Sequence, residues 1–158
     1  MKITSSALQY LAEGACIYRV QSPMKDFSDL DRFRPKLRQE YHTGRLDRKD
    51  LAANAVEQFA KWFEDALDKA QKPNVMILAT SAKGRTTARS MLLKGFTKQG
   101  FVFYTNYGSP KANDLEQNPR ATLLFYWHEL ERQVRIEGKV KKVPKEVSQR
   151  YFHSRPRD

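Results

Sequence analysis

The stretch from Val75 to Asn106 reads VMILATSAKGRTTARSMLLKGFTKQGFVFYTN and decides the fold. Short runs rich in β-branched and aromatic residues alternate in it with segments typical of turns. It predicts three strands separated by two turns, with strands at 75–80, 85–96 and 101–106 and turns at 81–84 and 98–100. Because short turns join antiparallel neighbours, these strands are predicted to lie in an antiparallel sheet.

A helix is predicted before the strands. From Val56 to Ala70, apolar residues recur at helical spacing with charged residues between them. Asn54 can accept hydrogen bonds from the free N–H groups of the first turn, and Glu57 makes a capping-box-like start. Pro73 stops this helix.

The segments after Asn106 complete the predicted order of elements. They are a short helix opened by Ser109 and Pro110 and ending near 118–119, strands at 121–128 and 132–143, and a last helix at 145–153 terminated by Pro156. The predicted fold is therefore mainly β with flanking helices. Five strands with short turns favour a barrel over an open sheet.

Length and composition indicate one folded domain with an arm before it. The chain has 158 residues, and hydrophobic residues make up 40% of them, which is ample for a packed core. Residues 1–50 show no sustained period and are predicted to form a loosely ordered N-terminal arm, with the folded domain at 51–158. The single cysteine excludes an intramolecular disulfide framework, and the three histidines lack metal-ligand spacing, so no metal site is predicted.

The sequence favours a cytoplasmic protein without a membrane partner. No apolar run approaches the roughly 20 residues that a membrane-spanning helix needs. The first twenty residues are interrupted by Glu13 and Arg19 and do not read as a secretory signal.

The net charge favours an anionic partner. Lys and Arg number 29 against 18 Asp and Glu, which gives a formal charge of +11. Nucleic acid, an acidic membrane and a small phosphorylated ligand would all be attracted by such a charge. The basic residues are dispersed except for runs at 32–38 and 139–142, and such runs are most often solvated faces. Charge alone does not name the partner.

Two places in the chain are candidates for binding an anion. Side chains alternate along a strand, so Arg89, Met91 and Leu93 share one face, while Ser90, Leu92 and Lys94 share the other. A lone Arg and a lone Lys in an apolar strand are costly to bury unless an anion is bound, although both charges could reach solvent at the strand ends.

The second candidate is the helix that Ser109 opens. Its free N–H groups and its dipole favour a phosphate, and Lys111 lies in its first turn. An ordinary helix cap is the alternative interpretation of the same residues.

Six motifs in order and spacing closely resemble those of the pyridoxamine/pyridoxine 5′-phosphate oxidases. They are Arg89-Ser-Met-Leu-Leu-Lys94, Phe103-Tyr-Thr-Asn106, Asn118-Pro-Arg120, Phe125-Tyr-Trp127, Glu131-Arg-Gln-Val134 and Tyr151-Phe-His-Ser-Arg-Pro-Arg157. The resemblance runs from about residue 37 to residue 158. It implies an FMN-binding split β-barrel, antiparallel and Greek-key-like, that works as a homodimer. The implied activity is oxidation of pyridoxamine or pyridoxine 5′-phosphate to pyridoxal 5′-phosphate, with dioxygen giving hydrogen peroxide.

The resemblance also assigns residues to two ligands. For FMN it implies contacts from the strand at 89–94 and from the segments that follow: Arg89, Ser90, Met91, Leu92, Lys94, Tyr104, Thr105, Ser109, Lys111 and Gln133. For the substrate it implies Arg38, Tyr41, Lys94, Tyr151 and Arg155. Two phosphorylated ligands need several cations, which agrees with this basic set. No strong general base is implied among these residues, because the cofactor carries the chemistry.

Two departures from the family pattern bear on function. Pro110 stands where the family usually has a basic residue, which removes one FMN-phosphate contact but keeps the helix entry. Family members also continue past the position of Asp158, so we expect a chain truncated at the C-terminus that binds FMN and turns over slowly. The alternatives are a non-catalytic FMN- or phosphate-binding remnant of the family and, supported by charge alone, a basic nucleic-acid-binding protein. With the first interpretation favoured, no nucleic-acid partner is expected.

Overall fold

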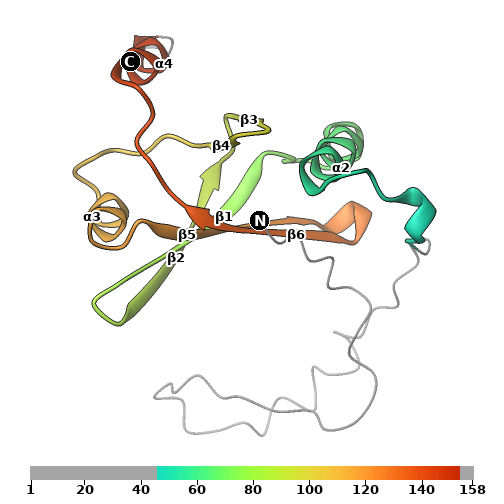
Figure 1. Ribbon diagram of the computed structural model, residues 1–158, viewed down its shortest axis with the longest axis horizontal. Coiled ribbons are helices and arrows are strands. Elements are labelled where there is room, and N and C mark those ends of the chain that lie inside the picture. Colours follow the sequence, from blue (N-terminus) through green and yellow to red (C-terminus); the bar gives the residue numbers. More distant parts are fainter. Residues whose placement is uncertain (1–45, 154–158) are drawn as a thin grey trace, which may run out of the picture.

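The structure, a computed structural model, describes residues 46–153 (Figure 1). The elements in chain order are η1 (Arg48–Asp50), α2 (Ala55–Lys69), β1 (Val75–Ala82), β2 (Arg85–Leu92), β3 (Gly95–Thr97), β4 (Gly100–Val102), α3 (Pro110–Gln117), β5 (Arg120–Trp127), η2 (His128–Leu130), β6 (Arg132–Lys139) and α4 (Lys145–His153). The predicted arm at 1–50 lies almost wholly outside the described residues. None of the helices in the described part is long and apolar enough to cross a membrane.

Six strands form two antiparallel sheets in the described chain. Four of them pair in the order β2-β1-β5-β6, and the short strands β3 and β4 pair with each other. The β1–β2 hairpin closes through Lys83 and Gly84, whose φ angles are 49° and 74°. Two successive residues with positive φ are what a two-residue hairpin turn needs, because their twist matches that of the flanking strands. The prediction of a mainly β, antiparallel protein with flanking helices is confirmed.

Helix α2 begins as the sequence predicts. The Asn54 side chain accepts hydrogen bonds from the backbone N–H groups of Val56 and Glu57 at 3.1 and 3.0 Å. These bonds satisfy two of the N–H groups that a helix start leaves without intrahelical partners. The helix buries Phe59, Trp62 and Ala66 against the sheet.

The sheet has one covered face and one exposed face. Every second residue of β1 is buried, and the register shows that the buried residues of β5 and β6 lie on the same face of the sheet. We call this the inner face; its buried apolar residues are Met76, Leu78, Leu123, Phe125, Trp127, Val134 and Ile136. The alternate residues form the outer face, where Ile77, Leu92 and Tyr126 are among the exposed large side chains. Figure 1 shows α2 and α3 at opposite ends of the sheet and α4 held away from it by the segment after β6.

The predicted strand at 85–96 is two strands, because the chain changes partners in its middle. Up to Leu92 the segment pairs with β1. The Leu93 N–H then donates to the carbonyl of Asn74, and the Lys94 N–H donates to the carbonyl of Val102. The chain thus leaves the larger sheet and enters the β3–β4 pair, so the single long strand was wrong.

Two other predicted strands are too long. The strand at 101–106 stops at Val102, because residues 103–106 lead into the turn before α3, where the Asn106 side chain accepts from the Gly108 N–H. The strand at 132–143 stops at Lys139, since its partner β5 begins at Arg120 and offers no further register positions. The last helix matches its predicted bounds, 145–153.

Candidate functional site

A broad cleft opens over the inner face between the β4–α3 connection and the chain after β6. Its volume is ≈ 1630 Å³. Its floor is apolar and comes from Met91 on β2, Leu123 on β5 and Ile136 on β6. Its walls come from residues 99–107, from α3, and from the segment 137–145 with α4. The cleft is at least as large as the roughly 300–1,000 Å³ that small-molecule sites usually have.

One wall of the cleft is an aromatic pair with a cation beside it. The rings of Tyr104 and Tyr151 are stacked with their centroids 3.6 Å apart and their planes 2° from parallel. The Lys94 Nζ lies 5.8 Å from the centroid of the Tyr151 ring. Tyr151 thus brings α4 into contact with the β4–α3 connection. Three predicted site residues that are distant in sequence therefore meet at this wall.

The start of α3 supplies polar groups next to that wall. Ser109 holds the N-cap position and Pro110 the first helical position, as predicted. The Ser109 side chain does not cap the helix; its hydroxyl lies 3.3 Å from the hydroxyl of Thr105. Lys111 follows in the first turn and lines the cleft. This end of α3 combines hydroxyls, a helix dipole and an ammonium group, which suits an anion.

Arg89 lies beside the cleft, in a polar network beneath α3. Its Nη1 donates to the carbonyl of Leu78 at 3.2 Å and to the Thr80 hydroxyl at 2.8 Å. Its Nη2 donates to the Thr87 hydroxyl at 2.5 Å. The Asp114 carboxylate on α3 accepts from the Thr80 and Thr87 hydroxyls at 2.8 and 3.0 Å and lies 4.0 Å from Nη2. The network joins β1, β2 and α3.

Ionised Asp114 is favoured in this network. The hydrogen bonds from Thr80 and Thr87 are the main causes that hold the pKa of the Asp114 carboxyl below its usual value, and the charges of Arg89 and Arg85 add to the effect. Desolvation opposes them but does not prevail. Asp114 therefore carries its charge at neutral pH and acts only as an acceptor.

The structure divides the predicted site residues into three groups. Those at or beside the cleft are Arg89, Met91, Lys94, Tyr104, Thr105, Ser109, Lys111 and Tyr151. Those on the outer face, as the strand registers show, are Ser90, Leu92 and Gln133. Those outside the described residues are Arg38, Tyr41 and Arg155.

Sequence reasoning missed the polar residues that come from other elements. Asp114 is 34 residues from Thr80 and 27 from Thr87, so no local pattern joins them. At the rim, Lys142 donates to Glu116 at 2.8 Å and lies 5.2 Å from the ring centroid of Tyr107. One signal in the sequence could have indicated this network. Thr80 and Thr87 stand on the two arms of the predicted hairpin, and alternation along the second strand puts Thr87 on the same face as Arg89.

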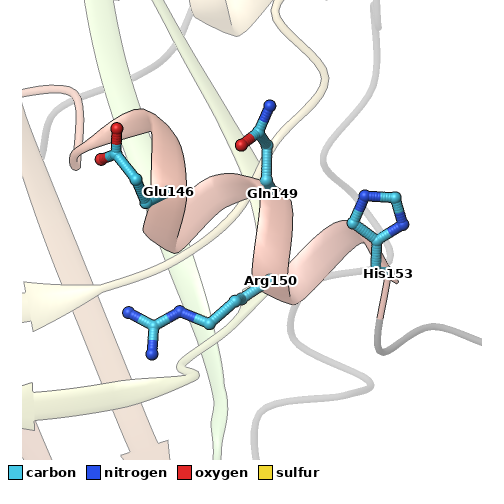
Figure 2. Close-up of a pocket in the computed structure, with 4 residues that line it drawn as sticks. All are labelled: Glu146, Gln149, Arg150 and His153. Carbon is cyan, nitrogen blue, oxygen red and sulfur yellow. The ribbon is translucent and has the colours of Figure 1, made fainter.

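A second, shallower hollow lies along α4. Its volume is ≈ 750 Å³, and Glu146, Gln149, Arg150 and His153 line it. Figure 2 shows Glu146 and Gln149 projecting to one side of the helix, Arg150 to another, and His153 at the C-terminal end. Gln149 also lines the cleft, so the two hollows meet at this helix. Within the described residues no group of His, Cys, Asp and Glu side chains has the arrangement of a metal site.

Comparison of the sequence with known families gives one match over most of the chain. The profile of the family described as "Pyridoxamine 5′-phosphate oxidase" matches residues 50–158. A pyridoxine/pyridoxamine 5′-phosphate oxidase from Bordetella pertussis is 52% identical over 122 residues, which are 76% of this chain and 58% of that protein. The oxidase of the same name from Salinibacter ruber is 53% identical over 123 residues, 77% of this chain and 57% of that protein. The chain thus matches somewhat more than half the length of these relatives.

Solved structures share the fold, and two of them illustrate it. PhzG from Burkholderia lata 383, in complex with tetrahydrophenazine-1-carboxylic acid, superposes with a TM-score of 0.67 at 22% identity, covering 72% of this chain and 58% of that one. A pyridoxamine 5′-phosphate oxidase-related, FMN-binding protein from Nostoc punctiforme gives a TM-score of 0.51 at 18% identity, covering 65% and 56%. The expected split-barrel fold is confirmed by these likenesses.

Proposed function

The chain belongs to the pyridoxamine 5′-phosphate oxidase family, and from this premise we propose that its cleft binds FMN and a phosphorylated B6 vitamer. The proposed reaction is oxidation of pyridoxamine or pyridoxine 5′-phosphate to pyridoxal 5′-phosphate, with dioxygen reduced to hydrogen peroxide. With the amine, water enters and ammonia leaves; with the alcohol, neither is needed. The oxidoreductase activity, the B6 substrates and the FMN are all parts of this proposal, which the family membership supports.

One observation carries the proposal: a single cleft combines an apolar floor with cations at its walls. Met91, Leu123 and Ile136 offer a surface on which a planar ring system can lie without losing hydrogen bonds. Lys111 lies at the wall of the same cleft, and the Lys94 Nζ lies 5.8 Å from the ring centroid of Tyr151, which lines it. Arg89 lies on the same face of β2 as Met91, two residues before it. Each proposed ligand joins a flat ring, whose faces can lie on an apolar surface, to an anionic phosphate, so the residues present fit FMN.

The start of α3 is the proposed place for the FMN phosphate. Lys111 would supply an ammonium group, and the hydroxyls of Thr105 and Ser109 would donate hydrogen bonds. Arg89 would supply a planar fork suited to two phosphate oxygens. Pro110 supplies no N–H, so the phosphate would depend more heavily on these side chains.

The aromatic wall is the proposed place for the substrate phosphate. Lys94 would neutralise its charge, and the Tyr151 hydroxyl would donate a hydrogen bond; Arg155, Arg38 and Tyr41 are the further predicted contacts. Anchoring the phosphate fixes one end of the vitamer and aligns its reactive carbon. When bound, FMN would accept a hydride equivalent from that carbon, and the protein side chains would orient both ligands and exclude water.

The outer face supports a proposal of a homodimer. Leu92 and Tyr126 are 43% and 57% exposed on it, and Ile77 is 36% exposed. Gln133 pairs with Tyr126 in the register and so lies on the outer face, away from the cleft of its own chain. If Gln133 contacts a flavin, that flavin belongs to a second copy packed on this face. Leu92→Lys should then convert a dimer to monomers in light scattering, whereas Leu67→Lys on the exposed side of α2 should not.

A flavin titration followed by an assay of turnover tests the proposal. The purified chain should bind FMN with quenching of flavin fluorescence and should release hydrogen peroxide from pyridoxamine 5′-phosphate. Binding without turnover of either vitamer would favour the non-catalytic remnant. Absence of flavin binding, together with salt-dependent binding of nucleic acid, would reject the proposal in favour of the third interpretation. A cytoplasmic location stays a prediction.

A further inference from the structure

The Arg89 network contains a carboxylate, that of Asp114, although a negative charge beside an anion site should repel the anion. Asp114 carries a negative charge within 4.0 Å of the guanidinium that the proposed function assigns to a phosphate. The side chains of Arg89 and Asp114 are 24% and 23% exposed, so both lie at the edge of the protein interior. Either Asp114 competes with the phosphate for Arg89, or it prepares Arg89 to receive the phosphate.

The direction of the hydrogen bonds separates these two roles. A guanidinium can only donate and an ionised carboxylate can only accept. The hydroxyls of Thr80 and Thr87 therefore accept from Arg89 and donate to Asp114. Asp114 thus fixes the rotation of both hydroxyls, and their lone pairs face the guanidinium.

A count of the guanidinium hydrogens shows what this arrangement leaves free. Arg89 has five N–H groups. Both hydrogens of Nη1 and one of Nη2 are used by Leu78, Thr80 and Thr87. The two threonine hydroxyl oxygens lie 3.1 Å apart. At this spacing they accept from the two N–H groups at the end of the guanidinium, one on Nη1 and one on Nη2. Among the described residues, no acceptor takes the Nε hydrogen or the second Nη2 hydrogen, and these two form the parallel side edge of the fork.

We propose that Asp114 is a positioning residue: through Thr80 and Thr87 it holds Arg89 by its end-on edge, so that the Nε–Nη2 edge is presented to the FMN phosphate. The inference rests on the proposed function for the identity of the anion. It assigns Asp114 no contact with the ligand. The benefit to binding is pre-organisation, because Arg89 would otherwise lose the freedom of several torsions when the phosphate binds.

Two variants test the proposal, one that changes the charge of the network and one that does not. Asp114→Asn removes the charge and one ordered acceptor, and Thr87→Val removes one hydroxyl without changing the charge. Each should weaken FMN binding, on the order of 10-fold, because a charge-assisted contact loses its fixed geometry. Riboflavin has no phosphate, so its affinity should stay the same in both variants. Asp68→Asn on α2 and Thr86→Val, the exposed neighbour on β2, are the matched controls and should leave both affinities unchanged.

A double-mutant cycle and the ligand-free protein complete the experiment. In an Arg89→Ala background, Asp114→Asn should no longer change the FMN dissociation constant, because its effect passes through Arg89. If Asp114→Asn tightens FMN binding, Asp114 is a competitor and the proposal is overturned. It is also overturned if riboflavin affinity falls as much as FMN affinity, since the effect is then structural.

A wild-type chain that does not bind FMN would reject the proposed function but not decide the role of Asp114. In that case the NMR signals of the Arg89 side chain in the free protein decide it. Restricted rotation of the guanidinium in the wild type and free rotation in Asp114→Asn would support the positioning role of Asp114. Equal rotation in the two proteins would overturn it.

Discussion

The inner face of the sheet is closed at the end nearest Trp127 and open at the end nearest Thr80. At the first end α2 lays its aromatic side chains on the sheet. At the second end α3 approaches with Asp114, and the cleft lies beside it. The same four strands thus serve two purposes along their length. Burial of apolar area gives stability at one end, and the other end keeps a cleft beside a polar network, where we propose that the ligands bind.

The closed end is organised around Phe59. The centroid of its ring lies 5.0 Å from that of Phe96 and 4.9 Å from that of Phe101, with both pairs edge to face, and 5.2 Å from that of Phe125. Phe59 is fully buried. It therefore joins α2, the β3–β4 pair and β5 in one cluster, and this cluster holds the smaller sheet against the larger one.

The open end is organised by hydrogen bonds instead. Thr80 is buried on the inner face, yet its hydroxyl is satisfied by Arg89 and Asp114. In the described chain no buried side-chain nitrogen or oxygen lacks a partner. Removing one member of this network leaves a polar group without its partner, and so its effects spread to the neighbours.

Phe59→Ala is expected to have the largest effect. Truncating a fully buried Phe leaves a cavity, and such changes cost about 3–5 kcal/mol of unfolding free energy. Denaturant unfolding followed by tryptophan fluorescence measures this cost. Leu67→Ala is the control on the same helix, because Leu67 is 58% exposed and should cost little.

The same variant tests whether the two ends are independent. At temperatures where Phe59→Ala remains folded, its FMN affinity should match that of the wild type. A loss of FMN affinity as large as the loss of stability would show that the cleft depends on the aromatic cluster.

At the open end, Arg89→Ala should have the reverse effect and weaken FMN binding more than it lowers the stability of the fold. Loss of a charge-assisted contact to a phosphate is worth about 1.5–3 kcal/mol, roughly a 10- to 150-fold rise in the FMN dissociation constant. Riboflavin affinity should not change. Lys61→Ala on the exposed side of α2 removes a positive charge far from the cleft and serves as the control for net charge. Equal FMN dissociation constants for the two variants would contradict the assignment of Arg89.

The closed end could be predicted from the sequence more fully than the open end. The period of α2 and its cap at Asn54 are local patterns, and both are found as predicted. Alternation correctly predicted that Arg89 and Met91 share one face of their strand, which the register shows to be the inner face. The predicted strand at 85–96 was wrong at Leu93, where the chain stops pairing with β1 and begins to pair with β4. This exchange depends on tertiary pairing, which local strand propensity does not predict.

The site residues show the same limit. The motif resemblance named Lys94, Tyr104 and Tyr151, and the structure brings them together. It could not indicate Asp114, because the role of that carboxylate arises from hydroxyls on two other elements. Nor could it show that Gln133 lies on the outer face, which requires the register of β5 with β6.

Asn54→Ala tests the N-cap of α2, the helix that covers the closed end, and should lower stability less than Phe59→Ala does. Losing an N-cap acceptor costs typically about 1 kcal/mol, since two N–H groups of the first turn lose their bonds. Thermal unfolding measures the loss. Asn54→Asp keeps an acceptor at the same place and should retain most of the stability, whereas an equal loss in both variants would show that the side chain does not act as a cap.

The smallest expected effect concerns the ion pair that fastens the rim of the cleft. Lys142, on the segment after β6, donates to Glu116 on α3 at 2.8 Å, and both side chains are more than half exposed. The hydrogen bond from Lys142 and its charge hold the pKa of Glu116 below its usual value, and the same contact raises the pKa of Lys142. The open end is therefore held partly by a contact that water and salt can weaken.

The sign of its pH dependence follows from these two shifts. A carboxyl with a lowered folded pKa stabilises the protein above its unfolded pKa, and this contribution is lost as the pH falls through the folded value. A lysine with a raised folded pKa stabilises below its unfolded pKa, and this is lost as the pH rises through the folded value. The pair should thus contribute most between the two unfolded values and fade toward either extreme.

Glu116→Gln should accordingly lower the unfolding midpoint slightly at neutral pH, by less than Asn54→Ala does. The difference from wild type should shrink as the pH falls below the ordinary carboxyl range, and also in about 1 M salt, where the screening length is about 3 Å. Lys142→Met should reproduce the neutral-pH effect, and the double variant should add little to either. If the difference persists undiminished in high salt, Glu116 acts through packing instead, and the rim of the open end is held in the same way as the aromatic end.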